Sequence, residues 1–307
     1  MLKSNILKSK TTLKNIGLAT VVSMMLFSCT EESKRGNKAD TTKESKKEEK
    51  KNSNLFEISG KVFSIPSPIQ TAFMLKNTGA AYSSELLNST ASVASYSTTD
   101  RKALNLGIFG ADMGYATIYD QTQDAISYMA VTKRLSSELG ITNIFNEDML
   151  TRFEANLGDQ DSLLALVSDA FKSVDSYLKT NKQEDISVMI LAGGWIETLH
   201  FATNLAKTND DPAIKNRIGE QKITIKNLIN LLLPYQEKPA IATVMNKLNE
   251  LKDIYNGIEF KYTFKEPTTD PETKTTTINS VLEVSMTAEQ LQEITIKVEE
   301  IRNSVIK

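Results

Sequence analysis

The sequence predicts an all-α fold, an irregular multi-helix bundle with one β-hairpin near the C-terminus. Apolar residues recur at helical spacing, helix-start signals precede them, and one C-terminal stretch alternates apolar with polar residues. The chain has 307 residues, of which 40% are hydrophobic and 24% charged, and its mean hydropathy is −0.27. This composition fits a soluble globular body and excludes a polytopic membrane protein and a wholly disordered chain.

The helical spacing gives apolar stripes such as the one from Leu291 to Val305. Ser67-Pro68-Ile69-Gln70 and Thr287-Ala288-Glu289-Gln290 have the pattern of capping boxes, in which a side chain satisfies the first free N–H groups of a helix. We expect helices near residues 67–88, 101–139, 147–157, 161–180, 184–207, 212–233, 239–257 and 288–305, the second of which can be broken into two.

The hairpin is expected at about residues 260–286. Phe260, Tyr262 and Phe264 alternate with polar residues, as do the residues from Ile278 to Met286, and turn-forming residues lie between the two runs. Because an isolated hairpin is only marginally stable in water, we expect its apolar face to pack against the helices.

The N-terminal residues 1–28 have the pattern of a secretory signal peptide. Four lysines precede an apolar run from Ile16 to Phe27, which is shorter than the roughly 20 residues that span a bilayer. Leu26-Phe27-Ser28-Cys29 resembles the lipobox of bacterial lipoproteins. That resemblance implies cleavage before Cys29 and a lipid anchor of palmitate-type acyl chains on it. The alternative is an ordinary signal peptide that contains a cysteine.

Residues 29–54 hold the cysteine and a charged stretch without Leu, Ile, Val or aromatic residues. Such a stretch cannot bury enough surface to offset the entropy of ordering, so we expect a disordered tether. Residues 55–307 are expected to form a single helical domain. This domain has 24 basic and 32 acidic side chains, a formal charge of −8.

Two features indicate where the anchored protein resides. The runs GADMGYATIYDQTQDA and GGWIETLHFATNLAK are similar to those of uncharacterised outer-membrane lipoproteins of Bacteroidota, and this resemblance implies an outer-membrane location. Glu31-Glu32 directly after Cys29 resembles the acidic export signal of surface-exposed lipoproteins in that group. It favours the cell surface, and the alternative is chance charge in a lipoprotein that faces the periplasm.

Composition also limits the chemistry. The formal charge of −2 gives no reason to expect nucleic-acid binding. One cysteine and one histidine exclude an internal disulfide, multi-cysteine metal sites and any site that needs two imidazoles. Glu197 and His200 have the Glu-x-x-His spacing of di-metal sites, but those sites use the motif twice. We predict no metal, no cofactor and no catalytic residue.

Two glycine-rich segments carry the candidate binding residues. Gly110 and Gly114 share a helix face that would let another backbone approach closely, and Gly193-Gly194 are candidates for the opposing surface. One interpretation is a ligand pocket, and the other is a tightly packed helix crossing. In the second, Asp112 is satisfied by a tyrosine hydroxyl or an exposed helix end, and His200 pairs with Glu197 or makes a packing contact. The candidate ligand-binding residues are Asp112, Tyr115, Tyr119, Trp195, Glu197 and His200.

The function favoured by these patterns is a non-catalytic protein-binding or scaffold subunit, anchored in the outer membrane through acylated Cys29. A membrane β-barrel complex for secretion, assembly or import is one kind of partner that such an anchor brings within reach. The hairpin loop from Lys265 to Lys274 and the terminal helix are candidate contact elements. The alternatives are a solute- or glycan-binding lipoprotein with its pocket between the glycine-rich helices, and a hydrolase that uses acidic side chains or one metal ion.

Overall fold

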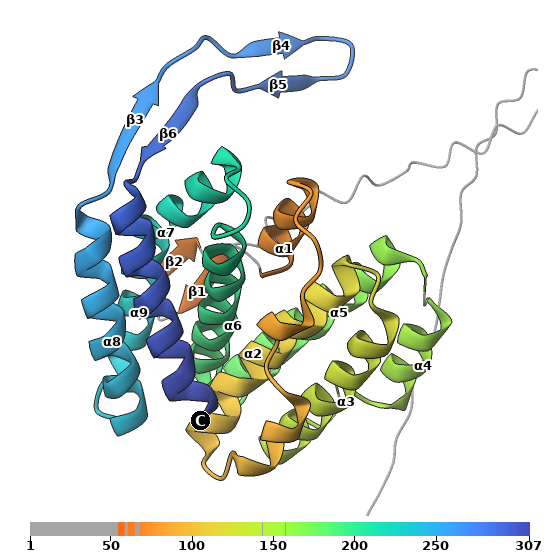
Figure 1. Cartoon of the computed structure of the whole chain (residues 1–307). Helices are drawn as coiled ribbons and strands as arrows, with labels where there is room; N and C mark the ends of the chain where they lie inside the picture. The colour runs from red at the N-terminus through yellow and green to blue at the C-terminus, as the bar shows by residue number, and fades with distance from the viewer. Residues whose placement is uncertain (1–54, 59–60, 65–67, 143, 157) are drawn as a thin grey trace, which may run out of the picture. The chain divides into compact units, whose positions relative to one another are not determined.

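The computed structural model describes residues 55–58, 61–64, 68–142, 144–156 and 158–307. The predicted signal peptide, lipobox and tether lie outside these ranges. The described chain is mostly α-helical with a hairpin near the C-terminus, as predicted (Figure 1). Its helices are α1 (Pro68–Asn77), α2 (Thr99–Ile118), α3 (Thr122–Glu138), α4 (Glu147–Ala155), α5 (Gln160–Thr180), α6 (Glu184–Leu205), α7 (Pro212–Leu232), α8 (Pro239–Asn256) and α9 (Ala288–Ile306).

Most helix boundaries match the prediction, and the first helix is the exception. The helix expected over residues 67–88 ends at Asn77, because Gly79 has a φ of +78° and the Thr78 N–H already closes the last turn on Met74. Two short 3-10 helices, Ser84–Leu86 and Thr90–Ser95, follow instead.

The second predicted helix is broken into α2 and α3, as the sequence allowed. Asp120 lies between them in the left-handed region, with a φ of 57°. At the C-terminal end, the predicted capping box of α9 is present, since the Thr287 hydroxyl accepts from Gln290 and the Gln290 side chain accepts from Thr287.

A further hairpin, which the sequence analysis missed, precedes α1. Strands β1 (Leu55–Ile58) and β2 (Lys61–Ser64) pair antiparallel, with Phe56 opposite Phe63. The sequence signal was present, because Ser59-Gly60 separates two short apolar runs by a turn-forming dipeptide.

Helices α2 and α6 form the centre of the core, and α1, α3, α5, α7 and α9 pack around this pair (Figure 1). Every residue of α2 from Ala103 onward is buried. Helix α6 is long and apolar enough to cross a membrane, but 94% of its most apolar 18-residue window is buried within the protein. That degree of burial is the pattern of a core helix.

The backbones of α2 and α6 touch at two glycines. A Cβ on Gly107 would lie 1.9 Å from the carbonyl oxygen of Ile190, and a Cβ on Gly193 would lie 1.9 Å from the carbonyl oxygen of Leu104. No residue other than glycine fits at either position without moving a helix. The predicted crossing of the two glycine-rich segments is therefore present.

The glycines predicted to permit this approach were the wrong ones. A Cβ on Gly110 would meet the Phe171 ring of α5 at 2.1 Å, and one on Gly114 would lie 3.3 Å from Ile69 of α1. Gly110 therefore makes room for an aromatic side chain, and neither residue faces α6. The helical spacing identified a shared face but could not identify the neighbour of each position.

Residues 259–285, here called the ribbon, form the C-terminal hairpin. Strand β3 (Glu259–Thr263) pairs with β6 (Val281–Ser285), and β4 (Thr268–Asp270) pairs with β5 (Thr275–Thr277) farther out. Figure 1 shows the ribbon rising from the adjacent ends of α8 and α9 and extending beyond the helices.

Only the base of the ribbon packs on the helices. A Cβ on Gly219 of α7 would lie 2.2 Å from Val284, so this side chain fills the space above the glycine. Farther out, the exposed fractions of Tyr262 and Phe264 are both 63%. The prediction that the apolar face of the hairpin docks on the helices is therefore wrong beyond the pair of Phe260 and Val284.

Candidate functional site

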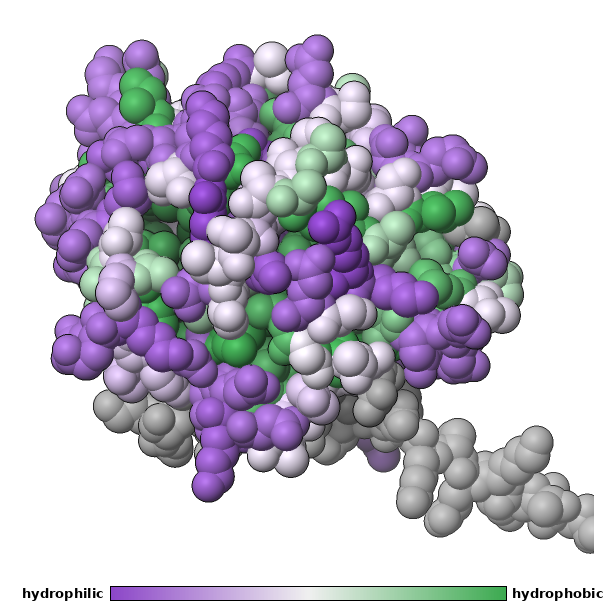
Figure 2. Space-filling view, turned by 90° about the horizontal axis from the view of Figure 1, so that it is seen from below, coloured by the Kyte–Doolittle hydropathy of each residue, from purple (hydrophilic) through white to green (hydrophobic). Residues whose placement is uncertain are grey.

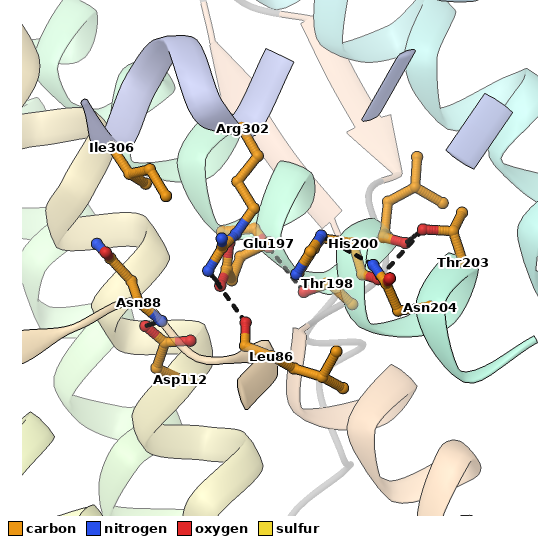
Figure 3. A network of polar contacts seen from close by, with 12 residues as sticks. Leu86, Asn88, Asp112, Glu197, Thr198, His200, Thr203, Asn204, Arg302 and Ile306 are labelled. Atoms are coloured by element: carbon orange, nitrogen blue, oxygen red, sulfur yellow. Dashed lines mark hydrogen bonds and ion pairs between the residues drawn. The ribbon is translucent and has the colours of Figure 1, made fainter. Parts of the chain in front are cut away.

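A buried ion pair joins the last helix to the centre of the core. Arg302 of α9 donates from Nε to Glu197 Oε2 at 2.5 Å and from Nη2 to Glu197 Oε1 at 2.6 Å. Its Nη2 also donates to the carbonyl oxygen of Leu86 at 3.0 Å. Figure 3 shows Arg302 reaching toward Glu197 on α6, with Leu86 beside the pair. Glu197 is completely buried, so the two hydrogen bonds from Arg302 take the place of those that water would donate to an exposed carboxylate.

Asp112 of α2 is the second buried carboxyl group of this cluster. It accepts from the backbone N–H of Asn88 at 3.3 Å through Oδ2, while Oδ1 has no donor. Burial, together with the adjacent charge of Glu197, raises the pKa of Asp112 well above its ordinary value, despite the opposing effect of Arg302. A protonated Asp112 carries no charge beside the Glu197 carboxylate. One positive and one negative charge then remain.

Asn88 organises the surroundings of Asp112. Its carbonyl oxygen accepts from the Tyr128 hydroxyl at 2.9 Å, and its Nδ2 donates to the Tyr96 hydroxyl at 3.1 Å. Tyr96 in turn donates to the carbonyl oxygen of Ile306 at 3.3 Å. These bonds fix the segment between α1 and α2 against both α3 and the end of α9. The segment from Ser83 to Thr98 therefore supplies buried polar contacts between α1 and α2.

His200 lies one turn beyond Glu197 on α6, but the two do not pair, contrary to one interpretation of the sequence. Its Nδ1 is 3.0 Å from Asn204 Nδ2 (Figure 3). Burial and then the positive charge of Arg302 lower the pKa of His200 to about 3, although the Leu86 carbonyl acts in the opposite direction. The imidazole is therefore neutral at physiological pH.

Tyr115 and Tyr119 lie in an aromatic cluster at the end of α2. The Tyr115 ring is 4.7 Å from Tyr119 and 4.7 Å from Phe201 of α6, and Tyr82 stacks on it at 5.4 Å between centroids. The Tyr115 hydroxyl accepts from the Ser83 N–H. Neither tyrosine hydroxyl satisfies Asp112, so that part of the packing interpretation is also corrected.

Trp195 of α6 faces α7, away from these groups. Its Nε1 donates to Gln221 Oε1 at 2.9 Å, beside a cavity of about 10 Å³. That volume has room for about one water molecule. The cavity is lined by Thr71, Trp195, Thr198, Leu199, Ala202, Arg217 and Gln221.

The six predicted ligand-binding residues thus fall into three separate places. Asp112 and Glu197 meet in the buried cluster with His200 nearby, the two tyrosines join the aromatic cluster, and Trp195 contacts α7. Within the described residues, no group of three or more His, Cys, Asp and Glu side chains is placed to hold a metal ion. The cluster around Glu197 binds α2, α6 and α9 together, which is a structural task.

Sequence reasoning missed Arg302, the partner on which this cluster depends. Its signal was a cation on the buried face of α9, next to Ile301 in the apolar stripe. Glu197 gave the complementary signal, an acid within the apolar stretch of α6. A charged residue inside an apolar face requires a partner of opposite sign, but the sequence does not say which of many residues it is.

Comparisons with protein families, curated proteins and solved structures found no match for this chain. Function is therefore inferred from its own residues.

Proposed function

We propose that this protein is a lipid-anchored subunit of the outer membrane that binds a protein partner and performs no catalysis. The anchor rests on Leu26-Phe27-Ser28-Cys29 and the basic, apolar leader before it. Acyl chains contribute about 0.8 kcal/mol for each buried methylene, so two or three of them anchor the protein stably at a membrane. The resemblance to Bacteroidota lipoproteins supports the outer membrane, with the cell surface favoured by Glu31-Glu32.

The observation that supports a binding function is that, in the described residues, the reactive side chains are buried and large apolar side chains are exposed on the ribbon. Asp112, Glu197 and His200, which are the groups best suited to catalysis, are buried. The Asn88 N–H, Arg302 and the Asn204 side chain are their respective partners. On the face seen in Figure 2, apolar residues are interrupted by hydrophilic ones. Large exposed apolar side chains instead gather on the ribbon: Tyr262, Phe264, Ile278, Val281 and Leu282.

The alternative of a solute or glycan pocket between the glycine-rich helices receives less support. The backbones of α2 and α6 are in contact at Gly107 and Gly193, which leaves no space for a ligand at the crossing. The cavity beside Trp195 has room for about one water molecule. A sugar or peptide ligand needs a site of several hundred Å³.

The anchor is tested by mass spectrometry of the mature N-terminus and by fractionation of cell envelopes. We expect acyl chains on Cys29, and we expect Cys29→Ser to release the protein from the membrane fraction. A bare sulfur, or a Cys29→Ser variant that still sediments with envelopes, would contradict the proposed anchor.

The binding function is tested by co-purification of the full lipidated protein from gently solubilised membranes. We expect a defined partner at constant stoichiometry after crosslinking in intact cells. A protein that runs alone under every crosslinking condition would overturn the proposal, whatever the state of Cys29.

A further inference from the structure

The ribbon has one apolar face and a second, mostly polar face, on which Val281 lies opposite Thr263. In its register Phe260 lies opposite Val284 and Tyr262 opposite Leu282, so these four side chains share a face. Lys261 lies opposite Glu283 between them, on the other face. The sequence therefore builds an amphipathic ribbon that resembles a half-buried sheet.

The apolar face is continuous, but the protein covers only its first part. At the base, Val284 fills the space above Gly219, and its N–H donates to Asn216 of α7 at 3.3 Å. Lys222 lies over the Phe260 ring at 5.8 Å. One cross-strand pair farther out, Tyr262 is 63% and Leu282 39% exposed, although both belong to the same face.

Polar side chains stiffen the outer ribbon without any core beneath it. Asn279 Nδ2 donates to the carbonyl oxygen of Glu266 at 2.6 Å and to the Thr268 hydroxyl at 2.8 Å. The Ser280 hydroxyl accepts from the Lys265 N–H at 3.1 Å. These bonds bridge the irregular part between the two strand pairs. They hold the register of a two-stranded element that would otherwise be marginal, so its apolar side chains are kept presented to the outside.

We propose that the apolar face of the ribbon, at Tyr262 and Leu282, binds a protein whose contact surface is apolar and rimmed by basic side chains. This inference rests on the proposed binding function and assigns it a surface. It also names the chemistry of the partner.

Charge selects this occupant over a membrane and over a second copy. The ribbon has five acidic and three basic side chains, and residues 55–307 have a formal charge of −8. Anionic lipid repels such a surface, and so does a second copy of it. A basic partner gains from the same field, which steers its approach.

The test is site-directed photocrosslinking of the full lipidated protein in native membranes. A photoreactive phenylalanine analogue is placed at Tyr262 or Leu282, and at Lys261 or Glu283 as controls on the opposite face. We expect adducts with one partner from the first two positions and none from the controls. The crosslinked segment of the partner is expected to be apolar with flanking lysine or arginine. The yield of the adduct is expected to fall as the salt concentration rises.

A matched pair of double variants then measures the contribution of each face. Tyr262→Ser with Leu282→Ser is expected to lower partner recovery by about tenfold or more, while Lys261→Ser with Glu283→Ser leaves most of it. Circular dichroism and thermal unfolding check that both variants fold.

Three outcomes overturn the assignment: adducts to lipid, adducts to a second copy of this chain, or equal crosslinking from both faces. If a partner still co-purifies while the ribbon gives no adducts with it, the surface is wrong and the binding function stands. If no partner is recovered from the unsubstituted protein, the binding function itself fails.

Discussion

The ribbon differs from the crossing of α2, α6 and α9 in the kind of contact that stabilises it. At the crossing, Glu197 and Arg302 are 105 residues apart in sequence, and their charges are held inside the core. In the ribbon, the hydrogen bonds of Asn279 and Ser280 span 15 residues or fewer, and all are exposed. Long-range contacts therefore hold the body together, while local contacts hold the ribbon. The ribbon can change without disturbing the body, but the crossing cannot.

The largest expected effect breaks the crossing itself. Gly107→Ala places a Cβ 1.9 Å from the Ile190 carbonyl oxygen, which is backbone and cannot yield. We expect a loss of more than about 4 kcal/mol in the free energy of unfolding, or no folded protein, as measured by denaturant titration.

The matched control is Gly114→Ala in the same helix, where the new Cβ meets only Ile69 at 3.3 Å. Its cost is expected to stay within about 1 kcal/mol, since alanine also improves helix propensity by about that amount. Equal losses for the two variants would contradict the role given to the close backbone contact.

The next effect separates the two buried carboxyl groups. Glu197→Gln leaves Arg302 as an uncompensated buried cation, for which we expect a loss of about 3–5 kcal/mol at neutral pH. Asp112→Asn keeps an oxygen that can accept from the Asn88 N–H and introduces no charge. It is expected to cost no more than about 1 kcal/mol, and to gain stability relative to the unsubstituted protein as the pH rises, because the amide binds no proton. Chemical denaturation at pH 7 compares them, and a reversed order would assign the charge to the wrong carboxyl group.

The pH dependence of stability sharpens the same comparison. Because the folded pKa of His200 is lowered to about 3, its contribution is complete above about pH 6.5 and is lost as the pH falls. Because the folded pKa of Asp112 is raised, its contribution is lost as the pH rises above about 4. The two slopes oppose each other between roughly pH 4 and 6.5.

Removing either group is therefore expected to reveal the pH dependence that the other group gives to the free energy of unfolding. Relative to the unsubstituted protein, Asp112→Asn should be stabilised as the pH rises across this window, and His200→Gln destabilised. Each slope changes by up to about 1.4 kcal/mol per pH unit. Denaturant unfolding at half-unit steps of pH measures both, and parallel curves for the three proteins would show that neither group titrates as assigned.

The smallest expected effect lies in the ribbon. Tyr262→Ser removes a side chain that is 63% exposed, so the free energy of unfolding should change by less than about 0.5 kcal/mol. Val284→Ala at the base removes packing against Gly219 and is expected to cost about 1 kcal/mol. Thermal unfolding ranks the two, and a larger loss for Tyr262→Ser would mean that the outer ribbon supports the body.

The sequence predicted what is local in this protein and missed what is distant. Helix starts such as Thr287 and Pro239 were found because capping depends on a few neighbouring residues. The early end of α1 was missed although Gly79 signalled it. The pairing of Glu197 with Arg302 could not be found, because a single sequence indicates that a buried charge needs a counter-charge but does not identify the residue that supplies it. The exposure of the outer ribbon was missed for a related reason: alternation identifies an apolar face but not what lies against it.

The close backbone contacts at Gly107 and at Gly193 restrict which residues can replace these glycines. A side chain at either position alone is blocked by the opposite backbone. We therefore expect both glycines to be retained for as long as the spacing between α2 and α6 is retained. A distant relative with this architecture must keep a glycine at both places, or else have spread the helices and refilled the gap with larger residues. The joint presence of these two glycines is therefore a stricter mark of shared ancestry in the body than any surface residue of the ribbon.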